Sequence, residues 1–255
     1  MEGISIIIPV FNKIEVTEKC ISRIREKKHE GAYEIIIIDN ASSDATPDIL
    51  ADASGIVYLR NNENLGLAKA CNRASAGARY DVVCFMHNDL FLEHNDGFNR
   101  IRDFVKHTPD AGVVGLYGAK TMRADGSFRG RSIVHAIAGA PRIARQCERV
   151  AVVDGLLIAM RRAVFMELGG FDDGYTQHYY DKDLSMRALE RRMNNYVLNI
   201  PFEHQAGTSR KEIKEDDLIR EEARQRFIVR WKGQLPTDVS TFGERLKYLL
   251  RRDNG

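Results

Sequence analysis

The sequence predicts an α/β protein built on a doubly wound, mainly parallel sheet that helices cover on both faces, with further helices at the C-terminus. Two observations predict the sheet: short, β-branched, continuously apolar runs read as strands, and amphipathic stretches of helical length separate them. A strand with one face in water would alternate apolar and polar residues instead. In addition, each apolar run ends in a polar cluster, and in such sheets ligands bind beyond the carboxyl ends of the strands.

Strands and helices alternate along the first ninety residues. We expect strands at residues 4–10, 33–39, 55–60 and 80–86, and helices at 16–27, 46–53 and 65–78. The polar clusters that follow the strands are PVFN (9–12), DNASSD (39–44), NNENLG (61–66) and HNDL (87–90). Because parallel strands end at the same edge of a sheet, these four clusters are expected to share one rim.

The second half adds a shorter series of elements. Residues 150–173 read as a strand, a tight polar turn and a short helix that two glycines end. Residues 178–193 read as an amphipathic helix. Residues 194–200 read as a strand that leads to His204 in a polar loop. Taken alone, that histidine is expected to be structural or solvated.

Two charged helices are expected at the C-terminus. The first spans 211–233, and the second, within 242–255, is short and basic. The second helix either packs on the domain or contacts a membrane surface. Segment 123–148, rich in Gly, Arg and Ala, is either a mobile loop over the site or a structural connection. The expected buried face of the first helix is Leu218, Phe227, Ile228 and Trp231. In the second helix, Leu246, Leu249 and Leu250 are expected to lie on one side.

Composition narrows the class of protein. A chain of 255 residues with 44% hydrophobic residues can build one sizeable core. The charges of its 38 basic and 36 acidic side chains nearly cancel, so the protein has no overall positive electrostatic field that would attract nucleic acid. The four cysteines show no CxxC spacing, which fits a reducing setting. No apolar run is long enough to span a bilayer and the start lacks the basic flank of a signal peptide, so we expect a cytoplasmic protein, soluble or peripheral at the inner face of the membrane.

The cluster after the strand at 80–86 has the chemistry of a metal site. The sequence contains no GxGxxG or GxxxxGK[ST] motif, so a bound phosphate would need a cation to neutralise it. Asp89 is the best ligand, because a hard divalent ion such as Mg²⁺ takes one or two carboxylates together with the substrate's phosphate oxygens. His87 admits Mn²⁺ as well.

The helix at 178–193 carries two carboxylates in its first turn. Asp183 and Arg187 lie four residues apart, which favours a surface ion pair worth a few tenths of a kcal/mol. Asp181 is either an N-cap or a carboxylate that faces the rim and accepts a proton from a hydroxyl.

Six motifs, in their order and spacing, resemble the family-2 glycosyltransferases of GT-A fold, especially the branch of rhamnosyl- and galactofuranosyltransferases. They are SIIIPVFN, IIIIDNASSDAT, NNENLGLAKACNRA, CFMHNDL, VDGLLIAMRRAVFMELGGFDD and YYDKDLSMRALERR. The resemblance covers roughly residues 3–210, and several ordered motifs together are far more specific than one alone. It implies a nucleotide-binding half (1–90) and an acceptor-binding half (91–210) within one GT-A domain (1–210), followed by a helical extension (211–255).

The resemblance also implies roles for individual residues. HND (87–89) takes the place of the family's DXD motif, with Asp89 as metal ligand, and His204 matches a histidine that can approach the metal or diphosphate. Asp181 matches the presumed catalytic base. The residues expected to contact the nucleotide sugar are Pro9, Val10, Asn12, Asp39, Asn40, Asn64, Gly66, Lys69, His87, Asn88, Asp154 and Gly155.

Two departures from the family pattern stand out. His87 replaces the first aspartate of DXD, and Tyr180 stands where a glutamate is common beside the base. The expected activity is an inverting, Mn²⁺- or Mg²⁺-dependent transfer from a UDP- or dTDP-linked sugar to a hydroxyl of a glycan or lipid-linked acceptor. Asp39 is suited to pair with N3 of either base. The alternatives are a nucleotidyltransferase and a catalytically weak nucleotide-sugar-binding relative.

Overall fold

A computed structural model describes residues 1–128, 133–135, 143, 145–205 and 216–250, with the backbone alone for 247–250. Its centre is an eight-stranded sheet in the order β10-β13-β6-β12-β4-β1-β2-β3. Strands β1, β2 and β3 pair in parallel, as do β1 with β4 and β13 with β6, whereas β12 runs antiparallel to both of its neighbours. The sheet strands are β1 (Ile4–Val10), β2 (Tyr33–Asp39), β3 (Val57–Arg60), β4 (Val82–Met86), β6 (Ala111–Gly115), β10 (Cys147–Val150), β12 (Leu157–Arg161) and β13 (Asn194–Leu198).

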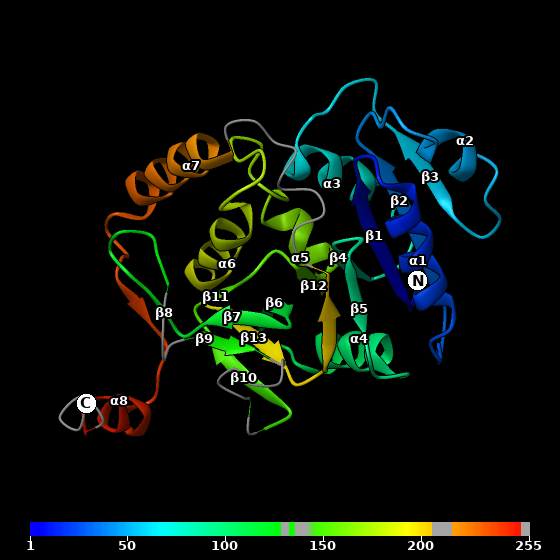
Figure 1. Cartoon of the computed structure of the whole chain (residues 1–255). Helices are drawn as coiled ribbons and strands as arrows, with labels where there is room; N and C mark the ends of the chain where they lie inside the picture. The colour runs from blue at the N-terminus through cyan, green and yellow to red at the C-terminus, as the bar shows by residue number, and fades with distance from the viewer. Residues whose placement is uncertain (129–132, 136–142, 144, 206–215, 251–255) are drawn as a thin grey trace.

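Helices cover both faces of this sheet, as the apolar runs predict (Figure 1). Alternate residues of β1 and β4 face opposite sides: Ile7 and Phe85 lie in one core cluster, Ile6 and Cys84 in the other. Helices α3 (Leu67–Ala76), α5 (Arg162–Glu167) and α6 (Tyr180–Glu190) contribute to the first cluster. Helices α1 (Ile14–Arg25), α2 (Thr46–Leu50) and α4 (Gly97–His107) contribute to the second. Strands β1 and β4 are therefore buried on two sides.

The predicted carboxyl rim is confirmed for the first strands. Val10 is opposite Asp39 across β1 and β2, and Asp39 is opposite Arg60 across β2 and β3. The PVFN and DNASSD loops therefore leave the sheet side by side.

Residues 150–173 differ from the prediction. The polar turn lies between two strands, β11 (Val152–Val153) and β12, and α5 follows β12 directly. Strand β12 inserts between β4 and β6, which joins the two halves of the chain in a single sheet. The run LLIAMRRAVF has no turn residue to separate a strand from a helix, so the pattern alone reads as one apolar segment.

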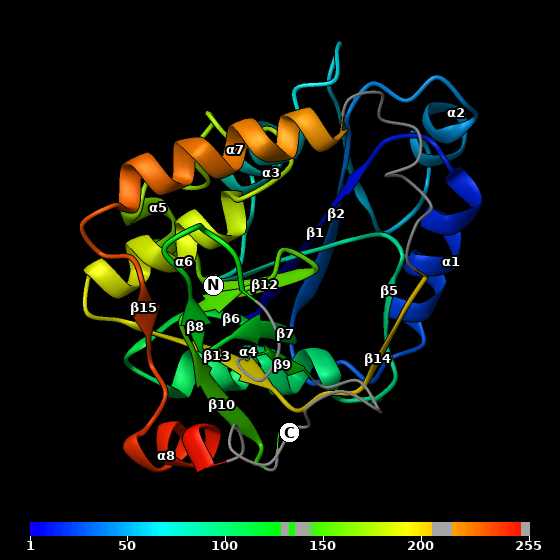
Figure 2. The ribbon, with the colours of Figure 1, turned by 60° about the vertical axis from the view of Figure 1, so that its left-hand side comes forward.

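Three small sheets flank the main one. The first is β11, β7 (Tyr117–Ala119) and β9 (Ile133–His135), and the second pairs β8 (Thr121–Met122) with β15 (Thr237–Asp238). The third pairs β5 (Leu90–Leu92) with β14 (Phe202–His204), which run side by side in Figure 2. Much of the expected segment 123–148 lies outside the described residues.

The C-terminal helices are present, with one error in the predicted packing. Helix α7 (Asp216–Trp231) lies beside α6 in Figures 1 and 2, and buries Phe227 and Trp231. Leu218, expected in its buried face, is 56% exposed, because the buried stripe begins only at Ala223. Helix α8 (Phe242–Leu250) exposes Leu246, and the side chains of Leu249 and Leu250 lie outside the described residues. In the described part of the chain, no helix has the length and apolarity to span a bilayer.

Candidate active site

Three side chains at the rim form a cluster with the chemistry of a metal site. His87 Nδ1 lies 3.9 Å and His204 Nε2 lies 3.5 Å from the same carboxylate oxygen, Oδ1 of Asp89. One ligand atom from each of the three residues lies within 4.8 Å of the others. Asp89 is largely buried, whereas the two imidazoles are partly exposed. The cluster is thus open on one side.

These residues fit a divalent ion. Two ligand atoms that each lie about 2.1 Å from one metal can be at most about 4.2 Å apart, and both separations from Asp89 fall within that limit. Two imidazole nitrogens with one carboxylate suit Mn²⁺ better than Mg²⁺, which prefers oxygen ligands.

The β5–β14 ribbon explains why residues so distant in sequence meet. His204 is opposite Leu90, the residue after Asp89, and the Gln205 N–H donates to the Asp89 carbonyl at 3.0 Å. Asn88, between the two ligands, turns away and donates through Nδ2 to Thr17 Oγ1 on α1 at 3.0 Å. Periodicity alone gives His204 no partner, because a pairing of three-residue strands leaves too weak a pattern to predict, and only the family resemblance pointed to a place near the metal.

A turn at residues 154–156 connects this cluster to Asp181. The Gly155 N–H donates to Asp181 Oδ2 at 2.8 Å, and the Leu156 carbonyl accepts the N–H of His87 at 3.2 Å. A side chain at Gly155 would collide with the phenol of Tyr180, so this close approach requires glycine. The turn fixes the base candidate relative to the metal cluster.

Asp181 is not the N-cap of its helix. Helix α6 starts at Tyr180, and its N-cap is Tyr179, held at φ 66°. The Asp181 carboxylate is buried and has Lys182 Nζ at 3.8 Å from Oδ1, while the Lys182 N–H donates to the same oxygen at 2.8 Å. Tyr180, at the family's glutamate position, packs edge-on against Phe171, with ring centroids 5.1 Å apart.

Asp183 makes the predicted pair with Arg187, but the pair is buried. Arg187 Nε donates to Oδ2 at 2.8 Å, and from α7 the Trp231 indole donates to Oδ1 at 3.0 Å, with Arg230 Nε at 3.2 Å. Burial raises the pKa of Asp183, against the opposing effect of Arg187 and Arg230. The expectation of a surface pair was wrong because it considered α6 alone, whereas α7 packs on α6 and covers the pair.

The PVFN and DNASSD loops hold each other in a strained conformation. Asn12 and Lys13 both have left-handed backbones, φ 59° and 60°, which cost of order 1–3 kcal/mol each. The Asn12 N–H donates to Ser42 Oγ at 2.7 Å, and Asn12 Oδ1 accepts the Ser43 N–H at 2.8 Å. Residues kept in strained conformations by neighbouring loops often mark a binding site.

Asp39 is fully buried below that loop pair. Tyr58 OH donates to its Oδ2 at 2.6 Å, Arg60 pairs with the same oxygen, and Ser42 N–H donates to Oδ1 at 2.8 Å. Burial, assisted by the bond to Asp39, raises the pKa of Tyr58 to about 12. The sequence does not single out Tyr58 and Arg60, although the parallel register of β2 and β3 would have placed them beside Asp39. Base pairing by Asp39 stays a prediction.

The NNENLG loop is organised around Asn40. Its Nδ2 donates to Asn64 Oδ1 at 2.6 Å, and its Oδ1 accepts from Asn61 Nδ2 at 2.9 Å and from the Leu65 N–H at 3.0 Å. Gly66, at φ 77°, leads into α3, where the expected binding residue Lys69 is exposed. Asn40 and Asn64 therefore shape the loop.

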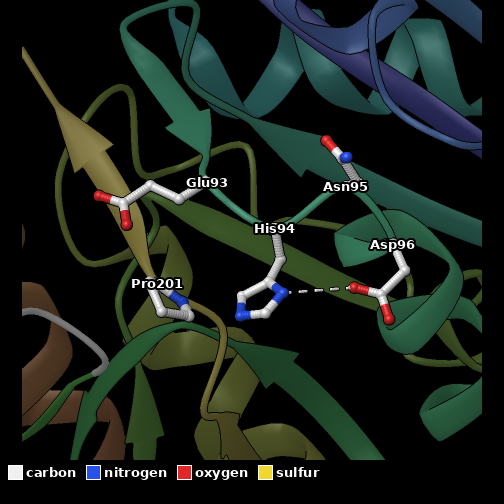
Figure 3. Close-up of a pocket in the computed structure, with 5 residues that line it drawn as sticks. All are labelled: Glu93, His94, Asn95, Asp96 and Pro201. Carbon is white, nitrogen blue, oxygen red and sulfur yellow. Dashed lines mark ion pairs between the residues drawn. The ribbon is translucent and has the colours of Figure 1, made fainter.

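An open depression of about 600 Å³ lies elsewhere (Figure 3). Glu93, His94, Asn95, Asp96 and Pro201 line it, and Figure 3 shows His94 facing Asp96, with Nδ1 to Oδ1 at 3.6 Å. Glu93 and Pro201 flank the β5–β14 ribbon at its end away from Asp89 and His204. The depression is therefore not part of the cluster.

Known proteins resemble this chain in sequence. It is 26% identical over 182 residues to poly-β-1,6-N-acetyl-D-glucosamine synthase of Staphylococcus aureus (strain COL). The match covers 68% of this chain and 42% of the synthase, so the chain spans less than half the length of that relative.

Two solved structures share the fold. The mannosyltransferase PcManGT from Pyrobaculum calidifontis, in complex with GDP-Man and Mn²⁺, has a TM-score of 0.57 at 17% identity, covering 76% of this chain and 54% of that one. GalNAc-T7 with UDP, GalNAc and Mn²⁺ has a TM-score of 0.65 at 15% identity, covering 80% of this chain and 44% of that one. The predicted GT-A fold is confirmed.

The sequence of the chain determines the family to which it belongs. A narrower place in the rhamnosyl- and galactofuranosyltransferase branch stays a prediction, as do the roles of the individual site residues. The sequence model of the family matches residues 5–169, more than half of the chain, and the chain therefore belongs to glycosyl transferase family 2.

Proposed function

We propose that the protein transfers a sugar, with inversion, from a UDP- or dTDP-linked donor to a hydroxyl of a glycan or lipid-linked acceptor. One observation carries the proposal: the turn at 154–156 joins the carboxylate of Asp181 to the backbone of His87. A candidate base and a candidate metal cluster are thus held by the same short turn, as a reaction between them requires. Family membership favours this activity over the nucleotidyltransferase alternative.

The donor nucleotide is proposed to lie along the rim formed by the first strands. Val10 ends β1 opposite Asp39, which ends β2, and Pro9, Asn12 and Asn40 lie next to these two residues in sequence. Asn64, Gly66 and Lys69 complete the binding surface at the start of α3. The hydrogen bonds among these loops preorganise them, so less ordering entropy is lost when the nucleotide binds.

Asp89 and His204, with His87, would hold Mn²⁺ or Mg²⁺ beside the donor diphosphate. When bound, such an ion stabilises the negative charge that develops on the leaving nucleoside diphosphate. The partly exposed imidazoles leave the cluster open toward the rim, where the phosphates would approach. Asn88 supports the cluster through its bond to Thr17 on α1. Asp154 and Gly155 would border the donor sugar.

Asp181 is proposed to accept the proton of the acceptor hydroxyl as that oxygen attacks the anomeric carbon. A positioned carboxylate typically contributes roughly 10²- to 10⁴-fold to such a step. Attack from the face opposite the leaving group is a single displacement, which inverts the anomeric carbon. The hydrogen bond from Gly155 and the charge of Lys182 hold the carboxylate in place.

We propose that the acceptor binds to the second half of the domain, residues 91–210. A lipid-linked acceptor would bring the protein to the inner face of the membrane, and α8 offers the contact, since Phe242 is 83% exposed at its start. A cytoplasmic location is part of this proposal.

We expect Asp181→Asn to lower turnover by at least roughly 10²-fold, because the amide keeps the shape but cannot accept the proton. Release of the sugar from a panel of UDP and dTDP sugars, with and without Mn²⁺, measures turnover, and calorimetry with UDP or dTDP measures donor binding, which should hardly change.

Asp103→Asn on α4 is the matched control. It removes a helical aspartate that also pairs with the basic residue next to it, Arg102, at 2.8 Å, on the opposite face of the sheet. Asp183→Asn is not a suitable control, because removing one partner of a buried charge pair lowers the free energy of unfolding by about 3–5 kcal/mol. Equal turnover in Asp181→Asn and Asp103→Asn would remove Asp181 from the base role.

A further inference from the structure

We propose that Tyr117, Phe128 and His135 form a platform that binds one sugar ring of the acceptor next to Asp181. The proposal rests on the proposed function and narrows its acceptor to a carbohydrate that the protein recognises by a ring face. These three aromatic side chains are called the platform below.

The platform is a compact cluster that stays open to solvent. The ring of Tyr117 meets those of Phe128 and His135 nearly edge-on, at centroid distances of 5.9 Å and 4.9 Å. All three residues are partly exposed. Lys182 Nζ lies over the Phe128 ring, 5.4 Å from its centroid, and the partial exposure of the three side chains leaves aromatic area that offers apolar contact at little entropic cost.

Lys182 links the platform to the proposed base. Its Nζ lies 5.4 Å from the centroid of Phe128 and 4.4 Å from that of Tyr179, and it is 3.8 Å from Asp181 Oδ1. A single lysine side chain thus separates the Phe128 ring from the carboxylate. A sugar ring on the platform would present its hydroxyls to Asp181.

The backbone that carries Phe128 is fixed by two helices. Tyr179 OH, before α6, donates to the Gly126 carbonyl at 3.0 Å, and Arg224 Nη1 of α7 donates to the Asp125 carbonyl at 2.9 Å. Gly126 has φ +71°, a conformation that favours glycine in this turn. The position of Phe128 is therefore built in and does not depend on a bound acceptor.

Tyr117 ties the other side of the platform to the turn at the active site. Its carbonyl accepts the N–H of Asp154 at 2.8 Å. Tyr117 itself belongs to strand β7, which pairs with β11 and β9. Tyr117, His135 and the turn at 154–156 are thus parts of one small sheet and its ends.

The chemistry of the platform suits a neutral sugar. Sugar rings combine an apolar face with a rim of hydroxyls, and binding sites for small molecules combine aromatic area with a few polar groups. Burial lowers the pKa of His135, so its imidazole is neutral at pH 7 and can both donate and accept a hydrogen bond. Lys182 already shares its charge with Asp181, which makes it a poor anchor for an acceptor phosphate.

The test measures binding of methyl glycosides of glucose, N-acetylglucosamine, galactose, mannose and rhamnose by saturation-transfer NMR, with UDP or dTDP and Mg²⁺ present. We expect at least one glycoside to bind, and Phe128→Ala to weaken it about tenfold. Phe128→Leu, which keeps the apolar volume without a ring face, should weaken it similarly, and Phe128→Tyr should retain it. Calorimetry should give an unchanged nucleotide affinity in all of these variants.

Phe104→Ala on α4 is the matched control. Phe104 is also partly buried and also packs edge-on against another ring, that of Tyr196 at 5.2 Å, but on the other face of the sheet. Its loss should leave glycoside binding unchanged.

Other outcomes overturn the proposal in distinguishable ways. Glycoside binding that survives Phe128→Ala and Phe128→Leu, or no glycoside binding at all beside normal nucleotide binding, overturns the platform alone. Binding of a polyprenyl phosphate that depends on Lys182 and not on Phe128 also overturns it and assigns the acceptor to another class. Failure of the wild type to bind UDP or dTDP with metal overturns the proposed function as well.

Discussion

At the scale of the residue, the metal cluster depends on one oxygen. Asp89 Oδ1 is the atom from which both imidazole distances are measured, and the cluster contains a single carboxylate. The charge it can offer a divalent ion is therefore −1, with two neutral nitrogens if both histidines are deprotonated. This composition favours a borderline metal such as Mn²⁺ over the harder Mg²⁺.

We therefore predict that His87→Asp reduces the preference of the protein for Mn²⁺. A second carboxylate is a harder ligand than imidazole, so UDP or dTDP should bind with Mg²⁺ at least as tightly as in the wild type, and the ratio of the two metal-dependent affinities should fall severalfold. Calorimetric titrations with each metal measure that ratio. Asp89→Ala is the reference variant, in which the metal-dependent part of the affinity should vanish. An unchanged ratio in His87→Asp would mean that His87 does not contact the metal.

Single residues differ in how far the sequence could assign them. Asp89 and Asp181 were proposed as candidates from their places after a strand and in a first helical turn, together with the family motifs, and their roles stay predictions. Tyr58, Arg60 and the burial of Asp183 do not, since each depends on a neighbour in space that is distant in sequence. Periodicity reports the face on which a side chain lies, not the partner that it meets there.

At the scale of the element, α7 is fastened to the domain by charge as well as by its apolar stripe. Asp172, just beyond α5, accepts hydrogen bonds from Arg226 at 3.1 Å and from Arg230 at 2.5 Å. Asp183 on α6 accepts a hydrogen bond from the Trp231 indole. Burial acts to raise the pKa of Asp172, but hydrogen bonds from Gly174 and Arg226 and the charges of both arginines outweigh it, so the pKa is lowered from 3.8.

The sign of this shift predicts a pH-dependent stability. A carboxyl whose pKa is lower in the folded state stabilises the protein above its unfolded pKa, and that contribution is lost as the pH falls through the folded pKa. We predict that Asp172→Asn lowers the free energy of unfolding by about 1 kcal/mol at pH 7, a small value because both arginines are largely exposed. As the pH falls below 3.8 toward the lower pKa of the folded state, the difference between the two proteins should shrink, since a protonated Asp172 is as neutral as the asparagine.

Urea unfolding at several pH values, followed by fluorescence, measures this difference. Trp231 is the single tryptophan of the chain and is buried between α7 and α6, so its emission reports on this contact. Asp217→Asn, at a 95% exposed side chain of α7, is the control and should show no such pH dependence. A difference between wild type and Asp172→Asn that stays constant down to pH 3 would contradict the prediction.

The strands and helices from β1 to β4 were predicted, whereas α4 and β6 lie in a stretch to which no element was assigned. The strands of the first half carry their own signal, because continuous β-branched runs between amphipathic helices occur in sheets buried on both faces. Strand β12 was missed because its apolar run continues into α5 without a turn residue. The error at Leu218 arose because apolar spacing at the exposed start of α7 resembles that of its buried end.

At the scale of the whole molecule, helix α8 is anchored to the domain by a charge pair. In α8, Glu244 pairs with the buried Lys120, which also binds Glu148 at 2.6 Å. At roughly 100° per residue, Phe242 and Leu246 lie on the opposite side of the helix from Glu244. They are 83% and 45% exposed, and Figure 1 shows α8 at the margin of the molecule, apart from α7.

We predict that this outward face binds membranes that carry negative charge. An amphipathic helix binds a membrane surface through buried apolar area together with attraction of basic residues to anionic lipids. Arg245 lies between the two apolar residues in sequence, and its partly exposed guanidinium, which pairs with Asp238 at 3.1 Å, is a candidate for this attraction. In flotation with vesicles of phosphatidylcholine and phosphatidylglycerol, the wild type should float, and the double variant Phe242→Ser, Leu246→Ser should bind about tenfold more weakly. Vesicles of phosphatidylcholine alone should bind less. Val229→Ser, at an equally exposed apolar residue of α7, is the control and should float like the wild type. A wild type that stays with the soluble fraction on anionic vesicles, or an equal loss in Val229→Ser, would show that α8 is not the membrane contact.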